Sequence, residues 1–341
     1  MKKTLLIFSI LLTILFLGLA YCGYILYSKN LNTESQKTQY AYVAQKISIE
    51  EFIEQEDAHH IFKNKNQFLR SAKLLGVDMI REGRYQITPK MSNFSLLKDL
   101  KQGIQKPMQL SFNNIRTKEQ LSKTLSTKLN FDSLSMINLL NDSTFLSKYN
   151  LTPQTSVSIF IPNTYEVYWT ITPENLFKRM VRESEKFWNE NRLEKAQKTG
   201  LTKIEIITLA SIIEEESNKK SEKPTIAGLY MNRLKKGMLL QSDPTVKFAI
   251  QDFTIRRILR VHLETDSPYN TYRYVGLPPG PIRIPSIESI DAVLNYQVHN
   301  YIYMTAKADF SGYHAFATTY EEHQKNAVAY RRALNKRRIF H

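Results

Sequence analysis

Hydrophobic and polar positions divide the chain into parts with different patterns, and the most extreme part lies at the amino terminus. The segment Thr4–Tyr27 carries no charge for 24 residues and directly follows two lysines. A helix of this length, rising about 1.5 Å per residue, crosses the hydrocarbon core of a bilayer with some tilt. Because lysines before such a helix favour the cytoplasmic side, we expect a cytoplasmic tip at residues 1–3, a single-pass transmembrane anchor at residues 4–27, and export of the rest.

A cleavable signal peptide is the alternative for this segment. Gly18 and Ala20 are small residues of the kind that precede a cleavage site, but the apolar run continues well past Ala20. A lipoprotein anchor at Cys22, the single cysteine, has less support, because Tyr21 stands where a small residue is expected. We therefore favour an uncleaved anchor.

Beyond the anchor, residues 28–45 are polar without sustained periodicity, which predicts a tether. Residues 46–105 alternate between strand-like and helix-like patterns, which predicts a small α+β subdomain. Its expected elements are a strand at Ile47–Ile53, a helix at Lys65–Leu75, a strand at Gly83–Ile87 and a helix at Ser92–Gly103 with a serine N-cap and a glycine stop.

The remaining residues, 106–341, predict a larger mixed α/β domain, so the fold class of the whole chain is α+β. A capping box of Thr117 and Gln120 opens one of its helices. The expected helices are residues 117–129, 172–198, 202–218, 223–236 and 286–296, and the expected strands are Met108–Phe112 and Asn300–Ala306.

Composition narrows the class of protein. With 341 residues, 42% of them hydrophobic and 23% charged, the chain is globular and long enough for two domains. The formal net charge of +15 suits an anionic membrane surface, an acidic polymer or nucleic acid. The basic residues are scattered, without a zinc-ligand spacing, an RNA-binding aromatic signature or a P-loop, so we expect no nucleic-acid partner. His299, His314 and His323 lack a convincing ligand spacing, and we expect no metal.

Candidate chemistry lies at the end of the expected helix 202–218, where three glutamates follow an apolar run. Successive residues of an α-helix point about 100° apart, which puts Glu214 within the apolar arc, Glu215 on the opposite side and Glu216 at the edge. Glu214 is then the carboxyl expected in a desolvated environment, which raises a carboxyl pKa and suits a general acid for a glycosidic oxygen. The alternative is a solvated last turn in which all three glutamates face water.

Polar and aromatic side chains gather in two stretches downstream. Amide, hydroxyl and aromatic groups on rigid loops suit a sugar site, although each stretch also fits an ordinary turn. The candidate sugar-binding residues are Asn232, Gln241, Ser242, Asp243, Tyr269, Asn270, Thr271 and Tyr272.

Together these stretches resemble the MltG/YceG-like endolytic murein transglycosylases. The motifs that carry the resemblance are, in order, LASIIEEES (Leu209–Ser217), MNRLKKGMLLQSDPTV (Met231–Val246) and YNTYRYVGLPPGPI (Tyr269–Ile282). Upstream, FIPNTYEVYW is similar to the family's Phe-Pro-Asp-Thr-Tyr segment, with Asn163 in place of Asp, and HAFATTYEEHQKNAVAY (His314–Tyr330) resembles its closing helix. The resemblance covers roughly residues 45–335, within which residues 46–105 resemble a LysM-like subdomain.

The resemblance implies cleavage of the β-1,4 bond between N-acetylmuramic acid and N-acetylglucosamine within glycan strands, leaving a 1,6-anhydromuramic end. It carries the catalytic glutamate over to Glu214, with Glu216 as the reserve candidate for the acid or a supporting role, and it implies no cofactor. One glutamate suffices if the sugar's own C6 hydroxyl closes on C1, because tethering gives that hydroxyl a high effective concentration. The same carboxyl would protonate the leaving oxygen and then accept the C6 hydroxyl proton.

The resemblance also implies a location and partners. The catalytic domain would stand on the outer, periplasmic side of the cytoplasmic (inner) membrane, cutting nascent peptidoglycan strands beside the peptidoglycan synthases and limiting their length. The alternative is a non-catalytic scaffold of the cell-wall synthesis machinery, tethered to the membrane through residues 4–27, that binds peptidoglycan through the LysM-like module. Analysis of the products separates the two, because only the enzyme generates anhydro ends.

Overall fold

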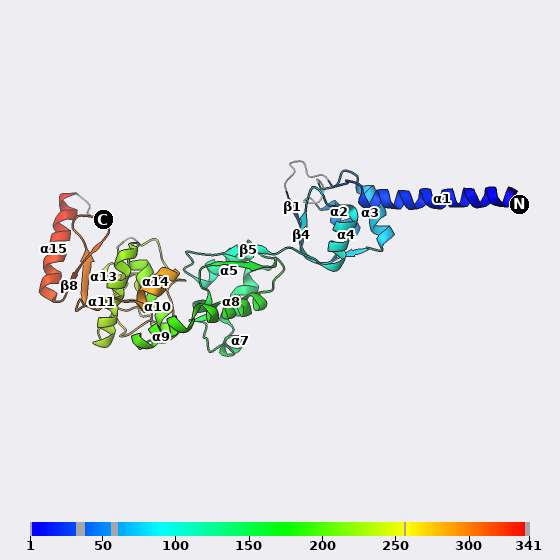
Figure 1. The fold of residues 1–341 in the computed structure, drawn as a ribbon. Helices are drawn as coiled ribbons and strands as arrows, with labels where there is room; N and C mark the ends of the chain where they lie inside the picture. The colour runs from blue at the N-terminus through cyan, green and yellow to red at the C-terminus, as the bar shows by residue number, and fades with distance from the viewer. Residues whose placement is uncertain (1, 32–37, 56–60, 256, 338–341) are drawn as a thin grey trace. The chain divides into compact units, whose positions relative to one another are not determined.

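The computed structural model describes residues 2–31, 38–55, 61–255 and 257–337. Helices and small two-stranded sheets build the described chain, which confirms the expected mixed α+β class (Figure 1). The chain divides into two compact units. The first comprises Met1–Leu110, Lys128–Phe131 and Tyr165–Thr172, and the second comprises Ser111–Thr127, Asp132–Thr164 and Pro173–His341.

The first unit carries the amino-terminal helix and a small α+β core. Its elements are α1 (Lys2–Tyr27), β1 (Gln39–Val43), β2 (Ile47–Ser48), α2 (Ile49–Glu54), α3 (Lys65–Leu75), β3 (Met79–Ile80), β4 (Gly83–Ile87), α4 (Asn93–Gln102), β5 (Met108–Ser111) and β6 (Thr164–Val167). β1 pairs with β4 and β2 with β3, both antiparallel, while β5 pairs with β6. The expected positions of α3, β4 and α4 are confirmed to within one residue.

Helix α1 is apolar and long enough to cross a membrane, and a signal sequence near the amino terminus has the same properties. Its side chains are exposed until its carboxyl-terminal end, where Ile25 is buried and the helix packs against α3 and α4 (Figure 1). The carbonyl oxygen of Ile25 accepts hydrogen bonds from Ser71 Oγ and Asn93 Nδ2, each at 2.9 Å. The end of α1 is therefore part of the folded unit.

The expected tether at residues 28–45 is wrong in its described part. Asn30 and Leu31 are buried, and Gln39–Val43 forms strand β1 against β4. Residues 32–37 lie outside the described residues. The segment is polar, and its pairing partner β4 is distant in sequence, so composition and local pattern did not predict the strand.

The expected strand at Ile47–Ile53 is also wrong. Only Ile47 and Ser48 are extended, and helix α2 follows at once. The cause is a capping box, in which the Ser48 side chain accepts a hydrogen bond from the Glu51 backbone and the Glu51 side chain accepts one from the Ser48 backbone. Alternation over so few residues does not separate a strand from one turn of helix.

The core of the first unit forms where β1 and β4 meet α3 and α4. Tyr85 and Ile87 of β4 both point into it, because every second side chain of a strand faces the same side. Phe68 of α3 and Leu96 and Leu97 of α4 close it, and all five side chains are fully buried. This packing holds the end of α1 in place.

The second unit is predominantly helical. Its elements are α5 (Lys118–Ser126), α6 (Ser133–Asn141), α7 (Ser143–Ser147), η2 (Ser156–Ile159), α8 (Pro173–Phe187), α9 (Glu190–Thr199), α10 (Lys203–Glu216), η3 (Lys220–Glu222), α11 (Lys223–Lys235), α12 (Asp243–Ile250), α13 (Arg260–Leu263), α14 (Ile287–Leu294), β7 (Tyr303–Ala306), β8 (His314–Ala317) and α15 (Tyr320–Lys336). The expected helix at residues 172–198 is two helices, because Asn189 caps a new one.

Helix α10 lies at the centre of the second unit. A capping box of Thr202 and Glu205 starts it, and every residue from Ile206 to Ile213 is buried. α11 and α14 pack against it. The carboxyl-terminal part, by contrast, contains the β7–β8 hairpin and α15; the segment His314–Ala317, expected to open a helix, is strand β8.

Candidate active site

The three consecutive glutamates at the end of α10 contact three different sets of partners. Successive side chains on an α-helix point about 100° apart, since 3.6 residues make one turn. Glu214 therefore reaches α11 and α14, Glu215 reaches two arginines, and Glu216 reaches a cavity.

Glu214 is ion-paired. Its Oε2 accepts a hydrogen bond from the buried Lys223 Nζ at 2.9 Å, one from Ser286 Oγ at 2.6 Å, and one from Ser289 Oγ. Burial raises the pKa of Glu214, but the three hydrogen bonds and the charge of Lys223 outweigh it and hold the pKa below its ordinary value. The sequence-based expectation of a raised pKa at Glu214 is therefore wrong.

Glu215 is part of an arginine cluster. Arg116 donates to both carboxylate oxygens, from Nε at 3.0 Å and from Nη2 at 2.9 Å, and Arg283 Nη1 donates to Oε1. Only 17% of the Glu215 side chain is exposed. These contacts connect the end of α10 to the segments before α5 and α14, so Glu215 holds the fold together at this point.

Glu216 has no cation in hydrogen-bonding contact among the described residues. Its Oε1 accepts hydrogen bonds from Tyr230 Oη at 2.8 Å and Ser242 Oγ at 2.5 Å. Burial raises the pKa of Glu216 above its ordinary value, the charge of Asp243 adds to this, and the two hydroxyl donors and His314 oppose it. Both donors act on Oε1, so Oε2 is the oxygen left to carry a proton.

Glu216 opens into a cavity of about 220 Å³ whose exposed wall is mainly polar. Neither Glu214 nor Glu215 lines this cavity. The lining residues are Glu216, Leu229, Tyr230, Arg233, Leu240, Gln241, Asp243, Tyr272, Met304, Thr305, Ala306 and His314. A carboxyl of raised pKa beside hydroxyl, amide and carboxylate groups is an arrangement that can donate a proton to a bound polar molecule.

Two of the sequence motifs meet beside this cavity. Thr271 Oγ1 accepts a hydrogen bond from the Ser242 backbone at 3.0 Å and lies 2.8 Å from Thr245 Oγ1, and the Gln241 backbone donates to the Thr271 carbonyl at 3.0 Å. Gln241 has a φ of 53°, a left-handed conformation that this pairing maintains. The network fixes the loop that carries Gln241 and holds Ser242 against Glu216.

Asp243 and Tyr272 are hydrogen-bonded to each other in the wall of the cavity. Tyr272 Oη donates to Asp243 Oδ1 at 2.6 Å. Burial and the neighbouring Asp243 raise the pKa of Tyr272, so its hydroxyl stays a hydrogen-bond donor. With Gln241 and Glu216, these are the sequence-predicted residues that the structure brings to the cavity.

Other predicted residues lie outside it. Asn270 is fully buried and its amide donates to the carbonyls of Leu263 and Thr265, while Asn232 donates to the carbonyls of His299 and Tyr301. Ser242 and Thr271 are buried, and they take part in the hydrogen bonds that join the two motifs. Tyr269 packs against Phe248, and burial raises the pKa of Tyr269 to about 12. These side chains shape the loops.

Three titratable residues of the lining were not predicted. Tyr230 and Arg233 come from α11, and His314 comes from β8. Tyr230 directly precedes a recognised motif, and Arg233 is a buried cation within it, whereas His314 was judged only as a metal ligand. Among the described residues, no group of three or more His, Cys, Asp or Glu side chains is arranged to hold a metal ion.

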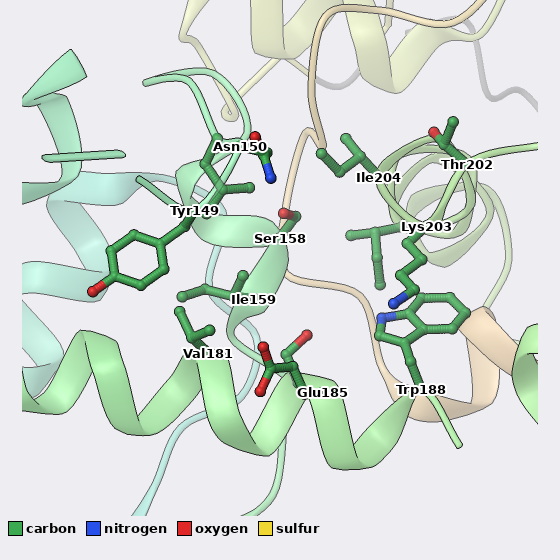
Figure 2. A pocket seen from close by; sticks show the side chains of 13 residues that line it. Tyr149, Asn150, Ser158, Ile159, Val181, Glu185, Trp188, Thr202, Lys203 and Ile204 are labelled. Atoms are coloured by element: carbon green, nitrogen blue, oxygen red, sulfur yellow. The ribbon is translucent and has the colours of Figure 1, made fainter. Parts of the chain in front are cut away.

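A second cavity, of about 500 Å³, lies away from the glutamates, between the loop after α7, helix α8 and the start of α10 (Figure 2). Glu185 of α8 and Trp188, directly after α8, line it together with Lys203 at the start of α10. None of the sequence-predicted site residues lines it. Cavity size alone therefore does not identify the candidate active site.

Comparisons with known proteins identify the family of this chain. The chain matches the model of the YceG-like family over residues 35–329. An endolytic murein transglycosylase of Bacillus subtilis (strain 168) is 28% identical over 293 residues, covering 81% of this chain and 80% of that protein. An endolytic murein transglycosylase of Streptococcus pneumoniae (strain D39) is 27% identical over 287 residues, which cover 75% of this chain and 52% of that protein. The crystal structure of a YceG-like protein from Listeria monocytogenes superimposes with a TM-score of 0.57 at 26% identity, covering 85% of this chain and 99% of that one.

Proposed function

The chain belongs to the YceG-like family, and from this premise we propose that it is an endolytic lytic transglycosylase of peptidoglycan. The bond cleaved is the β-1,4 linkage between N-acetylmuramic acid and N-acetylglucosamine inside a glycan strand, and the product carries a 1,6-anhydromuramic end. The observation that carries this proposal is a buried carboxyl of raised pKa opening into a polar cavity built from the family motifs.

Glu216, and not Glu214, is the general acid in this proposal. A general acid must hold a proton near neutral pH and give it to the leaving oxygen, which requires a raised pKa and a free oxygen facing the substrate. Glu216 meets both requirements, since its pKa is raised and its hydroxyl donors engage Oε1 alone. Glu214 meets neither, because Lys223 keeps it ionised and it does not line the cavity.

The bond-breaking step uses the substrate's own hydroxyl. Glu216 protonates O4 of the departing N-acetylglucosamine while the bond from C1 to O4 breaks, and the C6 hydroxyl of the muramic residue then bonds to C1. Tethering within one sugar ring gives that hydroxyl an effective concentration that water cannot match, so ring closure competes with hydrolysis. The hydroxyl proton leaves to a base in the same cavity, which restores a neutral product.

The cavity rim supplies groups for binding the glycan. Gln241 and Asp243 are exposed, and Tyr272 lies beside them with its hydroxyl on Asp243. An amide, a carboxylate and a phenol at one opening can hydrogen-bond sugar hydroxyl and N-acetyl groups. We assign orientation of the glycan to these three residues.

Helix α1 anchors the enzyme in the cytoplasmic membrane, with the catalytic unit on the outer side. The support is the length and apolarity of α1 together with its buried end, since Ile25 is held by Ser71 and Asn93. Cleavage after Ala20 would leave only the last turns of α1, still held by Ser71 and Asn93 of the folded unit. The net charge of +15 suits anionic lipid headgroups and acidic stem peptides alike.

The small α+β subdomain at residues 46–105 acts in this proposal as a LysM-like module that grips peptidoglycan near the membrane. The catalytic domain is the segment 106–341, and the peptidoglycan synthases are the partners from which nascent strands emerge. Strand length is then set by how soon after synthesis the enzyme cuts.

Digestion of purified sacculi by the full chain in detergent tests the proposal. Released muropeptides are analysed by mass spectrometry, and the wild type should generate anhydromuramic ends. Glu216→Gln should lower the rate by at least about 10²-fold, the usual contribution of a general acid, because glutamine has the same shape without a transferable proton.

Glu214→Gln is the matched variant in the same assay. Since Glu214 is ionised and outside the cavity, its replacement should retain most of the activity of whatever fraction stays folded. Normal anhydro production by Glu216→Gln together with its loss in folded Glu214→Gln would return the acid role to Glu214. Binding of sacculi without any anhydro product from the wild type would favour the scaffold alternative.

A further inference from the structure

A second proton-transfer group shares the cavity with Glu216. His314 begins strand β8 and lines the cavity together with Glu216 and Asp243. It comes from the β7–β8 hairpin, far in sequence from the glutamates. The side chain is 16% exposed, so it is packed on most sides and open to the cavity.

A buried carboxylate fixes the ring of His314. His314 Nδ1 lies 2.9 Å from Glu222 Oε2, and the His314 backbone N–H donates to Glu222 Oε1 at 2.6 Å. The Glu222 side chain is only 4% exposed. Ser217 Oγ, directly after α10, also donates to Glu222 Oε2 at 3.1 Å. The imidazole is therefore held in register with the end of α10, which carries Glu216.

The hydrogen bond to Glu222 determines the tautomer. Glu222 Oε2 accepts from Ser217 Oγ and lies 2.9 Å from His314 Nδ1, so Nδ1 is assigned as the ring nitrogen that carries the hydrogen and donates it. In the neutral ring Nε2 then has a free lone pair, and no hydrogen bond to it occurs among the described residues. Nε2 is the ring nitrogen available to a molecule in the cavity.

We propose that His314 is the base that accepts the proton of the C6 hydroxyl, with Glu222 as its positioning residue; this inference rests on the proposed function. As the bond from C1 to O4 breaks, the Glu216 proton goes to O4. As O6 bonds to C1, the O6 proton goes to His314 Nε2, and the imidazolium is stabilised by the hydrogen bond from Nδ1 to Glu222. Proton exchange with water then returns His314 to neutral and Glu216 to its protonated form.

A separate base suits the geometry of the acid. After it has given up its proton, Glu216 Oε2 faces the hydroxyl of the departing sugar, while Oε1 already accepts from Tyr230 and Ser242. A neutral imidazole in the same cavity can take the second proton before that sugar leaves. The titratable and charged groups that line this cavity with His314 are Glu216 from α10, Tyr230 and Arg233 from α11, Asp243 from α12, and Tyr272.

The test uses the sacculus assay with the full chain and four variants. His314→Ala should lose about 10²-fold in the rate of anhydro-end formation, the scale of a general base, and imidazole added to the buffer should restore part of it by filling the vacated space. Glu222→Gln should lose less, and should add little when combined with His314→Ala, because Glu222 does not line the cavity and reaches the reacting atoms through the His314 ring. His262→Ala, which removes a histidine outside the cavity, should match the wild type.

His314→Gln guards against a folding defect. Glutamine can still donate to Glu222 and fill the space, but it cannot accept a proton, so a variant with wild-type thermal unfolding should be slow and insensitive to imidazole. If either folded His314 variant retained activity within about threefold of the wild type, instead of losing about 10²-fold, the inference would be overturned. Additive losses of activity in the double variant would also overturn it. Absence of anhydro ends from the wild type would instead reject the proposed function on which it rests.

Discussion

At the scale of single residues, hydrogen-bond donors decide how two neighbouring carboxyls behave. Glu214 and Glu216 are both removed from bulk water, so burial alone does not distinguish them. Glu214 contacts an ammonium group and two hydroxyls, whereas Glu216 contacts two hydroxyls only. Burial without a cation raises a carboxyl pKa, and pairing with a cation lowers it. The pKa values of the two residues are therefore shifted in opposite directions.

Replacing each carboxyl by an amide should change the pH dependence of stability in opposite directions. The folded-state pKa of Glu214 is lowered, so its ionised form stabilises the fold above the ordinary value of 4.5, and that contribution is lost as pH falls. The folded-state pKa of Glu216 is raised, so ionisation above 4.5 costs the folded state stability. Relative to the wild type, Glu214→Gln should unfold at a lower temperature at neutral pH and converge with it in acid.

Glu216→Gln should show the reverse trend, gaining on the wild type as pH rises from about 4 towards neutrality, because the amide has no charge to bury. Thermal unfolding followed by circular dichroism across this pH range measures both variants. Parallel curves for the two variants would show that these carboxyls do not differ as described.

Tyr230→Phe should move the pH–rate profile without removing activity. The Tyr230 hydroxyl stabilises the ionised form of Glu216, so its loss raises the pKa of Glu216 further. Since Glu216 acts as an acid, the alkaline limb of kcat/KM against pH should shift to higher pH. Tyr149→Phe, in the larger cavity, is the control and should leave that limb in place. An unshifted limb in Tyr230→Phe would separate Tyr230 from the proton of Glu216.

At the scale of elements, the site depends on a helix with no exposed face. α10 is buried on all sides from Ile206 to Ile213, and α11 and α14 bring the partners of its terminal glutamates. Close packing against α11 uses a glycine. A Cβ at Gly228 would lie 2.1 Å from the Gln297 carbonyl oxygen and 2.7 Å from His299 Nε2, so the chain before β7 can approach only a residue without a side chain.

Gly228→Ala should therefore destabilise the second unit. Overpacking of this kind costs about 1–3 kcal/mol, because backbone atoms of the neighbouring segment must shift. We expect a lower thermal midpoint and a matching loss of active enzyme. Gly23→Ala in α1, where nothing lies within 4 Å of the added Cβ, is the control and should unfold like the wild type. An unchanged midpoint in Gly228→Ala would mean that this packing is looser than described.

At the scale of the whole molecule, the apolar amino-terminal helix and the candidate site belong to different units. The first unit holds the end of α1 through a buried polar network, in which Asn30 Nδ2 donates to Asn93 Oδ1 at 3.2 Å and Asn93 donates to Ile25. The second unit carries the glutamates and the cavity. α1 is thus a built-in part of the first unit, which favours retention of the helix in the mature protein.

Asn93→Ala should loosen this attachment. It removes the partner of Asn30 and one donor to the Ile25 carbonyl, and a buried polar group left without a partner costs about 1–3 kcal/mol. We expect faster amide hydrogen exchange around Ile25 and Asn30 in detergent, measured by mass spectrometry. Asn335→Ala, at an exposed position of α15, should not alter exchange there. Equal exchange in the two variants would show that the network does not hold the helix.

The sequence by itself determined the parts whose signals are local. A long uncharged run identified α1 as a membrane-spanning candidate, and capping residues and periodicity located α3 and α4. Ordered motifs indicated a candidate site at the end of α10 and in the loops around Gln241 and Tyr272, and these segments line one cavity. These features were accessible because each depends on residues close together in the chain.

Only the tertiary structure decided which neighbours surround each glutamate. Helical phase assumes one buried face, but α10 is buried all round, so the phase of Glu214 carried no information about its surroundings. Its pKa depends on Ser286 and Ser289, which are 72 and 75 residues away. That of Glu216 depends on Tyr230 and Ser242, at 14 and 26 residues. Electrostatic environment is set by distance in space, which folding fixes and sequence spacing does not.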